Sequence, residues 1–257
     1  MTLGAQARDT TAVPAAPNGV MLSFQRFADI FGSRLVAAFD SIPGSRYDYR
    51  PMPTQQSIGY IAQHVEAADY DLCERFADLK HPRAAKDSLA DTLKARWPKD
   101  TLVTRLRASL QFCDSAIERM PPVQTAALAS ALLAFETDLA EHYSQVATYM
   151  RLLGLVPPSA LPPRQHIAIS LPVSALSAYV GHYDLSSVDF SVTRENDALM
   201  IRSSAGGPPV RLWPETTSDF FVKEIDAQVT FHRDPAGKVN GFVLHQYGRE
   251  REARRIR

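Results

Sequence analysis

Three residues of the chain have the types and the spacing of a metal site: His64, Asp138 and His142. Asp138 precedes His142 by four residues, so on a helix the two side chains share one face. His64 lies beside the apolar stripe of a separate predicted helix. Two imidazoles and one carboxylate projecting from facing helices can hold a divalent metal ion and leave one position open. A histidine at the flank of a stripe also has a purely structural interpretation, in which it hydrogen-bonds to a neighbour.

Four further residues have two interpretations each. Tyr149 and Arg151 follow His142 in the same predicted helix, where they can contact an anion or substrate at the mouth of the site. Alternatively, Arg151 complements the dipole at the end of the helix and Tyr149 lies in an interface. Cys73 and Cys113 are either two buried small side chains or a disulfide that ties two helices together.

The elements that must position these residues are helices, because the apolar period between residues 20 and 153 is helical. Four amphipathic segments are predicted: 21–42, 54–79 with Thr54 as N-cap, 100–120 with Asp100 as N-cap, and 125–153 with Gly154 as C-cap. Four amphipathic helices of this length are typical of a four-helix bundle, which we place at residues 20–154.

The rest of the chain has a different pattern. Residues 155–172 are rich in proline and predict a semi-rigid linker. Over residues 173–257 the apolar period is two, and turn signals separate about seven or eight short segments. This pattern predicts an antiparallel curved sheet or small barrel, and therefore an α+β chain of two domains. The arginine-rich end, residues 249–257, is expected to be a solvated last strand.

Composition limits the classes of function. Lys+Arg and Asp+Glu both number 28 in 257 residues, so the balanced charge argues against nucleic acid as a partner. No apolar run reaches the roughly 18–20 residues of a membrane span. Residues 1–19 favour a disordered tail or the remnant of a signal peptide, because Ala5-Gln6-Ala7 has the form of a cleavage site. A signal peptide would make the protein periplasmic or secreted, and its absence cytoplasmic.

Two segments carry a resemblance to a known family. Residues 51–65, which include His64, resemble the second-helix motif of the DinB-like superfamily, and residues 141–158, with Tyr-x-Arg, Gly and Pro-Pro, resemble its fourth-helix motif. The resemblance implies an up-down-down-up bundle, often a homodimer, in which three histidines hold a metal ion. His64 and His142 match two of these positions, and Asp138 stands at the third. Such a set suits zinc, nickel or manganese, although the missing imidazole is also consistent with loss of metal and of activity.

The β half resembles a small domain of unknown function that often follows β-lactamase-like serine hydrolases of exported bacterial proteins. The resemblance begins at the pattern Leu176-x-x-Tyr179-Val180-Gly181-x-Tyr183 and implies an accessory module, lipocalin-like in shape. Two functions follow. One is a metal-dependent enzyme, a thiol transferase or hydrolase that acts on an unknown small molecule. The other is a non-catalytic accessory protein with a degenerate metal site and a ligand- or partner-binding β domain. Ligand atoms that converge on an open position favour the enzyme, whereas an Asp138 turned to solvent favours the accessory protein.

Overall fold

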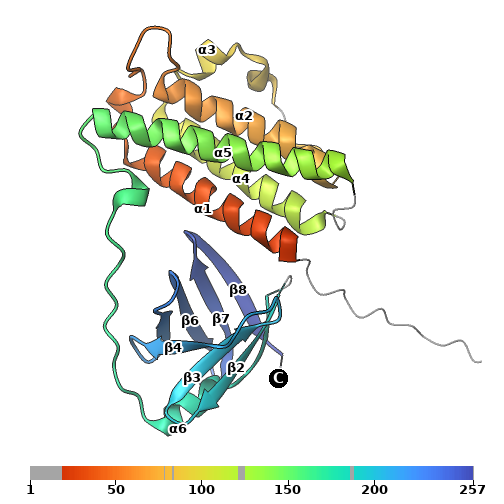
Figure 1. Ribbon diagram of the computed structural model, residues 1–257, viewed down its shortest axis with the longest axis vertical. Coiled ribbons are helices and arrows are strands. Elements are labelled where there is room, and N and C mark those ends of the chain that lie inside the picture. Colours follow the sequence, from red (N-terminus) through yellow and green to blue (C-terminus); the bar gives the residue numbers. More distant parts are fainter. Residues whose placement is uncertain (1–18, 78, 83, 121–124, 186–187, 257) are drawn as a thin grey trace, which may run out of the picture.

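The computed structural model describes residues 19–77, 79–82, 84–120, 125–185 and 188–256 (Figure 1). Helices occupy the N-terminal part of these residues and a closed barrel of eight antiparallel strands the C-terminal part. The predicted α+β fold class, a helical bundle followed by a β domain, is therefore confirmed. The tail or signal-peptide remnant predicted at residues 1–19 lies outside the described residues, except for its last position. Of the helices described, none has both the length and the apolar character needed to cross a membrane.

Four long helices make up the bundle. They are α1 (Gly19–Ser41), α2 (Ile58–Ala77), α4 (Lys99–Arg119) and α5 (Ala126–Leu152). Lys99 at the start of α4 donates a hydrogen bond to the carbonyl of Asp40 near the end of α1, so α1 and α4 run antiparallel. A disulfide joins Cys73 of α2 to Cys113 of α4 in the second half of each helix, so these two run parallel. With α5 antiparallel to α2, the order is up-down-down-up, as predicted (Figure 1).

Two of the predicted helix starts are wrong. The second helix begins at Ile58 rather than after Thr54, because the amides of its first turn are satisfied from outside the helix. The amide of Ile58 bonds to the carbonyl of Tyr49, and the hydroxyl of Ser57 accepts from the amide of Tyr60. The third long helix begins at Lys99, directly after Pro98, so Asp100 lies in its first turn and is not the cap.

The ends of the last helix agree with the pattern. The hydroxyl of Thr125 accepts a hydrogen bond from the amide of Leu128 at 3.2 Å, which caps α5. Gly154 follows the helix with a φ of 74°, a left-handed conformation that favours glycine.

A return segment between α2 and α4 makes their parallel arrangement possible. It contains the short helices η2 (Ala85–Ser88) and α3 (Asp91–Lys94), and a further short helix, η1 (Gly44–Arg46), follows α1. The return segment packs closely on the start of α2, since a Cβ on Gly59 would lie 2.3 Å from the carbonyl oxygen of Ala95. Arg105 of α4 fastens the segment further by bridging Glu66 of α2 and Asp87 of η2 at 2.6 and 2.5 Å.

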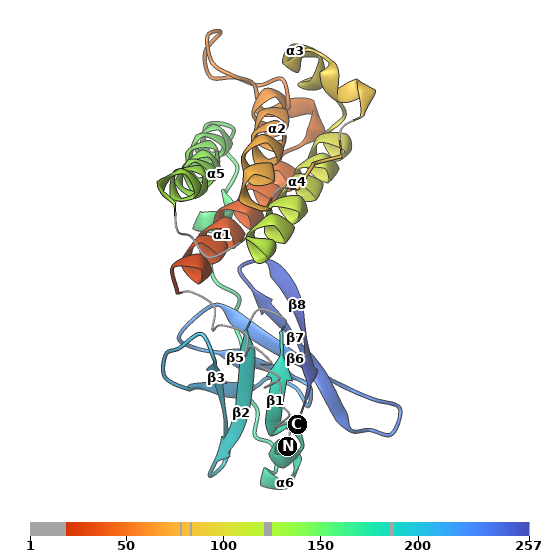
Figure 2. The ribbon, with the colours of Figure 1, turned by 90° about the vertical axis from the view of Figure 1, so that its right-hand side faces the viewer.

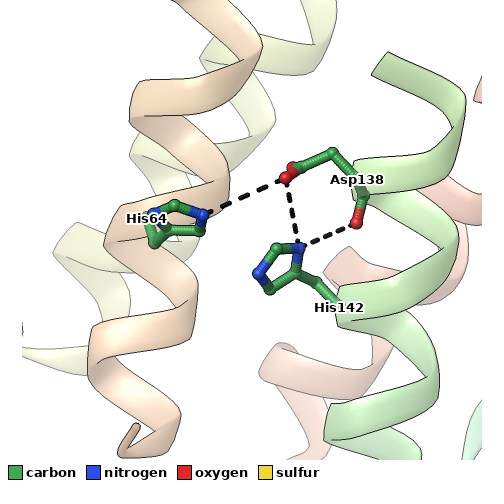
Figure 3. A group of neighbouring side chains, drawn as sticks. All are labelled: His64, Asp138 and His142. Carbon is green, nitrogen blue, oxygen red and sulfur yellow. Dashed lines mark hydrogen bonds and ion pairs between the residues drawn. The ribbon is translucent and has the colours of Figure 1, made fainter. Parts of the chain in front are cut away.

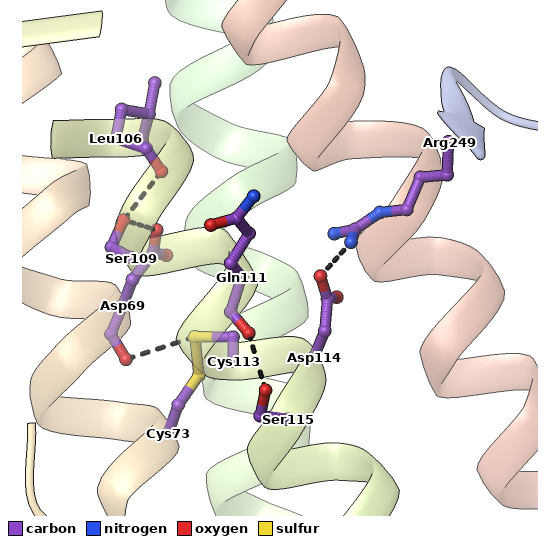
Figure 4. The surroundings of a disulfide bond; sticks show 9 residues. All are labelled: Asp69, Cys73, Leu106, Ser109, Gln111, Cys113, Asp114, Ser115 and Arg249. Atoms are coloured by element: carbon purple, nitrogen blue, oxygen red, sulfur yellow. Dashed lines mark hydrogen bonds and ion pairs between the residues drawn. A yellow bond between two sulfur atoms is a disulfide. The ribbon is translucent and has the colours of Figure 1, made fainter. Parts of the chain in front are cut away.

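The disulfide lies within the bundle core. The Cα atoms of Cys73 and Cys113 are 5.1 Å apart and both side chains are buried (Figure 4). Around them pack fully buried aliphatic and aromatic side chains from all four long helices, among them Leu35, Phe39, Ile61, Val65, Leu106, Phe135 and Leu139.

The barrel is an up-and-down barrel in which each strand pairs with its neighbours in sequence. Its strands are β1 (Gly181–Asp184), β2 (Asp189–Glu195), β3 (Ala198–Ser203), β4 (Val210–Pro214), β5 (Asp219–Val222), β6 (Ala227–Arg233), β7 (Val239–Gln246) and β8 (Arg249–Arg255). Pairing of Tyr183 and Asp184 with Arg255 and Arg254 joins β1 to β8 and closes the barrel.

One end of the barrel is closed by the chain that leads into it. The helices α6 (Val173–Leu176) and η4 (Ser177–Tyr179) place Leu176 and Tyr179 in the barrel core. Upstream of them, after the short helix η3 (Pro158–Ala160), the chain follows the barrel wall. There His166 stacks on Phe221 with ring centroids 4.8 Å apart and bonds to Glu215 at 3.0 Å.

The barrel and the bundle meet at the β7–β8 turn, which reaches α1 and α4 (Figure 2). Arg249 pairs with Asp114 (Figure 4). It also pairs with Asp29 at 2.8 Å, and Arg251 pairs with Asp29 as well. The prediction that residues 249–257 form a solvated strand is therefore wrong for these two arginines, because carboxylates of the bundle pair with them and leave them only 22% and 27% exposed. The Asp29 side chain is 1% exposed.

Candidate metal centre

Two facing helices bring the three predicted ligands together. His64 projects from α2, and Asp138 and His142 project from successive turns of α5, so all three side chains meet in the space between the helices (Figure 3). One ligand atom from each residue lies within 4.8 Å of the other two. Within the described parts of the chain, this is the one group of histidine, cysteine and acidic side chains that satisfies this criterion.

The distances show a loose but convergent site. His64 Nε2 lies 3.9 Å from Asp138 Oδ1, and the rings of His64 and His142 have centroids 4.9 Å apart. Two ligands bonded tetrahedrally to zinc at about 2.1 Å would be roughly 3.4 Å apart. The separation between His64 Nε2 and Asp138 Oδ1 exceeds this value by only about 0.5 Å.

The orientation of His142 is fixed by its own helix. Its Nδ1 donates a hydrogen bond to the backbone carbonyl of Asp138 at 2.8 Å and lies 3.4 Å from Asp138 Oδ1. A hydrogen bond from one ring nitrogen sets the tautomer of a metal-binding histidine and leaves the other nitrogen as the ligand. Nε2 of His142, which points toward His64 in Figure 3, is therefore the nitrogen left free to bind an ion.

The orientation of His64 is set by an aromatic neighbour. Tyr60, one turn earlier in α2, stacks on the imidazole with ring centroids 6.3 Å apart and an interplanar angle of 13°. The His64 side chain is 38% exposed, whereas that of His142 is 10% exposed. The site thus has a buried side at His142 and an open side at His64.

The carboxylate of Asp138 is the least satisfied group of the site. Burial raises the pKa of Asp138 above its ordinary value, and the neighbouring His142 and His64 oppose that rise. Its Oδ2 is buried and has no hydrogen-bond partner. One oxygen of this carboxylate lies near the two imidazoles and the other is buried and unpaired. A cation would stabilise such a group, so the donor set fits a divalent metal ion.

A second buried acid lies near the site. Asp69 of α2 accepts a hydrogen bond from the hydroxyl of Ser109 at 2.7 Å (Figure 4). Burial above all, and then the charge of Asp138, raise the pKa of Asp69 well above its ordinary range. Asp69 thereby favours its neutral form more than an exposed aspartate does.

The site opens into a cavity of about 780 Å³. Its walls are formed by Gln55, Gln56, His64, Asp138, Glu141, His142, Ser144, Gln145, Thr148 and Tyr149. The hydroxyl of Tyr149 accepts from Gln145 at 3.1 Å and donates to Gln55 at 3.4 Å. Amides and hydroxyls thus dominate the walls, and among the residues that line them in the described chain Glu141 and Asp138 are the acids.

The structure separates the two residues predicted to contact substrate. Tyr149 is buried and lies in the cavity wall. Arg151 is exposed, donates to the carbonyl of Ala147 in its own helix at 3.3 Å, and is absent from the wall. This position suits the interpretation in which Arg151 complements the helix end.

Several residues of the site were not identified from the sequence. Tyr60 precedes His64 by four residues, so the same spacing argument that pairs Asp138 with His142 would have found it. Gln55 and Gln56 come from the loop before α2, where no periodic signal indicates the direction of a side chain.

Two family models match the chain, one in each half. Residues 29–146 match the family model of the DinB superfamily, and residues 165–255 match that of the Domain of unknown function (DUF3471). No curated protein matches the chain. A solved structure titled "Crystal structure of SurE with D-Leu" is 21% identical with a TM-score of 0.33, and the alignment covers 47% of this chain and 28% of that one. A similarity this low carries no argument about fold or function.

Proposed function

We propose that this chain, in which a bundle of the DinB superfamily is fused to a DUF3471 barrel, binds one divalent metal ion through His64, Asp138 and His142 and is a metal-dependent enzyme. One observation supports this most directly: Asp138 turns toward the two histidines, and the three ligand atoms converge beside an open cavity. An Asp138 turned to solvent would instead have supported a non-catalytic accessory protein.

The proposed reaction is thiol transfer or hydrolysis of a small molecule. A divalent ion bound here would lower the pKa of a thiol or a water molecule at the open position. Glu141 lies in the cavity wall, and we assign it to accept the released proton. Gln55, Gln145 and Tyr149 present amide and phenol groups that can orient a polar substrate.

Metal analysis of protein purified without a histidine tag tests the site. We expect close to one equivalent of zinc, nickel or manganese in the unmodified protein, and at least a tenfold reduction in His64→Ala and Asp138→Asn. The matched control is His182→Ala, which removes an exposed histidine from the barrel. Negligible metal in both the unmodified protein and His64→Ala, even after reconstitution, would refute the metal site and favour the accessory function.

An activity screen then separates the two reactions. Thiols paired with electrophiles, and esters or amides alone, are tested with each metal. Glu141→Gln is expected to lower turnover while retaining the metal, since Glu141 is assigned to proton transfer and not to binding of the ion. Full activity in this variant would remove Glu141 from the mechanism and leave the metal site intact.

We also infer that the protein is exported, since the structure contains a buried disulfide and such bonds persist in oxidising compartments. Cell fractionation and N-terminal sequencing test this inference. A periplasmic or secreted chain that begins at Arg8 would support it, whereas a cytoplasmic chain with an intact Met1 would contradict it.

A homodimer formed through the bundle is the proposed assembly. Phe27 of α1 and Leu133 of α5 support it, because they are large apolar side chains that are 52% and 57% exposed. Light scattering of the purified protein is expected to give twice the mass of the chain, and Leu133→Glu is expected to lower it. A monomer at all concentrations would refute the proposal.

A further inference from the structure

We infer that the barrel binds one small, uncharged, apolar molecule in the end that faces the bundle. This inference is independent of the metal site, because it rests on the barrel alone. At this end the strands leave a cavity of about 260 Å³ that opens at the rim.

The cavity arises from a gradient of side-chain size along the strands. On β6 the inward positions are Phe231, Val229 and Ala227, from the closed end to the open end. On β5 the size of the side chains changes in the same direction: Phe220 lies toward the closed end, and Val222, the next side chain on the inner face, lies toward the open end. Because residues two apart on a strand face the same side, each series contributes a large ring at one end and a small side chain at the other.

The closed end is filled by aromatic rings. Tyr179 enters it from η4, and the ring of Phe231 lies 4.8 Å from that of Tyr179 and 5.5 Å from that of Phe242. These residues are at most 3% exposed. At the open end, Ile201, Val222 and Leu244 face the cavity and are too short to meet across it. An eight-stranded barrel is just wide enough either to be filled by side chains or to hold one small ligand, and here each half does one of these.

The lining determines the chemistry of the ligand. It consists of aliphatic side chains with Phe190, and two neutral polar groups, Ser203 and Gln246, lie at the ends of β3 and β7. Among the lining residues in the described part of the chain, none carries a charge. A charged ligand would lose its hydration without gaining a partner, so the occupant is apolar with at most one neutral polar tip.

The volume determines the size of the ligand. A dry apolar cavity of ~150 Å³ holds benzene, so 260 Å³ corresponds to a molecule of about ten heavy atoms. The turn after Gln246 is the one that contacts α1, since a Cβ on Gly248 would lie 2.6 Å from Ser33. The cavity therefore opens on the side of the barrel that is held against the bundle.

Methyl NMR spectroscopy with 1-octanol as the probe tests the inference in the full-length protein. Saturable shifts are expected for Ile201, Val222 and Leu244, and none for Ile61 and Val65 in the bundle. Octanoate, which has the same chain and a charge, is expected to bind at least tenfold more weakly. The His64→Ala variant is expected to bind octanol unchanged, so this outcome is separate from that of the metal site.

Two matched variants locate the probe. Ala227→Leu fills the cavity and is expected to lower octanol affinity at least tenfold, whereas Gln228→Leu places the same side chain on the outer face of β6 and should bind as the unmodified protein does. If Ala227→Leu does not fold, Val222→Phe serves the same purpose. The absence of saturable shifts, equal affinity for octanoate, equal shifts in the bundle, or unchanged binding by a folded cavity-filling variant would each overturn the inference.

Discussion

The disulfide between Cys73 and Cys113 gives a prediction whose size follows from the chain. The two cysteines are 40 residues apart in sequence and tie α2 to the helix that runs parallel to it. The cross-link limits the unfolded chain, and the chain-entropy relation assigns about 4 kcal/mol to a loop of this length. Cys73→Ala/Cys113→Ala, or reduction of the unmodified protein, should lower the free energy of unfolding of the bundle by about this amount.

The measurement must report on the bundle alone. The chain has two tryptophans, Trp97 beside α4 and Trp213 in β4, so a Trp213→Phe background leaves one fluorophore that follows unfolding of the bundle. With a slope of about 2 kcal/mol per molar urea, a loss of 4 kcal/mol moves the unfolding midpoint down by roughly 2 M. The slope itself should rise, because the reduced chain exposes more surface when it unfolds.

Two outcomes would refute the reasoning. Equal midpoints for the oxidised and reduced proteins would show that the cross-link does not restrict the unfolded bundle. Two free thiols, titrated under denaturing and non-reducing conditions, would show that the bond is absent. Cys73→Ala alone also removes the cross-link but keeps the buried sulfur of Cys113. It should therefore match the double variant, and a difference between the two would measure the contribution of that sulfur.

Three further predictions concern other parts of the fold. Arg249→Met leaves the carboxylate of Asp29 with Arg251 as its remaining arginine partner. We expect a loss of about 2 kcal/mol in the free energy of unfolding, the size of one hydrogen bond to a charged group, and faster proteolysis between barrel and bundle. No change in either measurement would contradict the contact. Burial raises the pKa of Tyr183 to about 12, so this tyrosine ionises first in the unfolded chain and the free energy of unfolding falls from pH 10 to pH 12. Tyr183→Phe should make this fall less steep. At neutral pH the same variant should cost about 1 kcal/mol, because it loses the hydrogen bond to the carbonyl of Tyr179. Gly59→Ala places a Cβ 2.3 Å from the backbone carbonyl oxygen of Ala95, so we expect a lower melting temperature. A melting temperature equal to that of the unmodified protein would contradict the observed packing.

The helices of the bundle are predictable from sequence because their apolar stripes persist over many turns. The start of α2 was not predictable in the same way. Its first amides bond to the carbonyls of Tyr47 and Tyr49, which the chain brings close only after it has turned. A cap supplied by such a turn leaves no pattern among neighbouring residues, whereas Thr125, which caps α5 with its own side chain, does.

The relation between Asp138 and His142 was likewise predictable, since four residues on a helix place two side chains on one face. That His64 would face them depends on the order in which the helices pack. The apolar stripe placed His64 only at its flank, and the resemblance to a family gave the further support. The contact of Arg249 with Asp29 had no signal at all. A strand rich in arginine and glutamate is typical of a solvated edge, and only the docking of the barrel against α1 turns Arg249 inward.

The aspartate at the third position of the proposed metal site would alter the charge that a bound ion carries. Three neutral imidazoles would leave a bound divalent ion with its full charge, whereas the carboxylate of Asp138 cancels one unit of it. A thiol or water at the open position would then be acidified less strongly than with three imidazoles, and oxygen-preferring ions such as manganese would compete better with zinc and nickel. The same carboxylate is buried with one oxygen unpaired, so it is costly to the empty bundle. Asp138 would thus destabilise the protein without an ion and would complete the set of ligands with one. Binding of an ion explains its presence more easily than a role in holding the helices together.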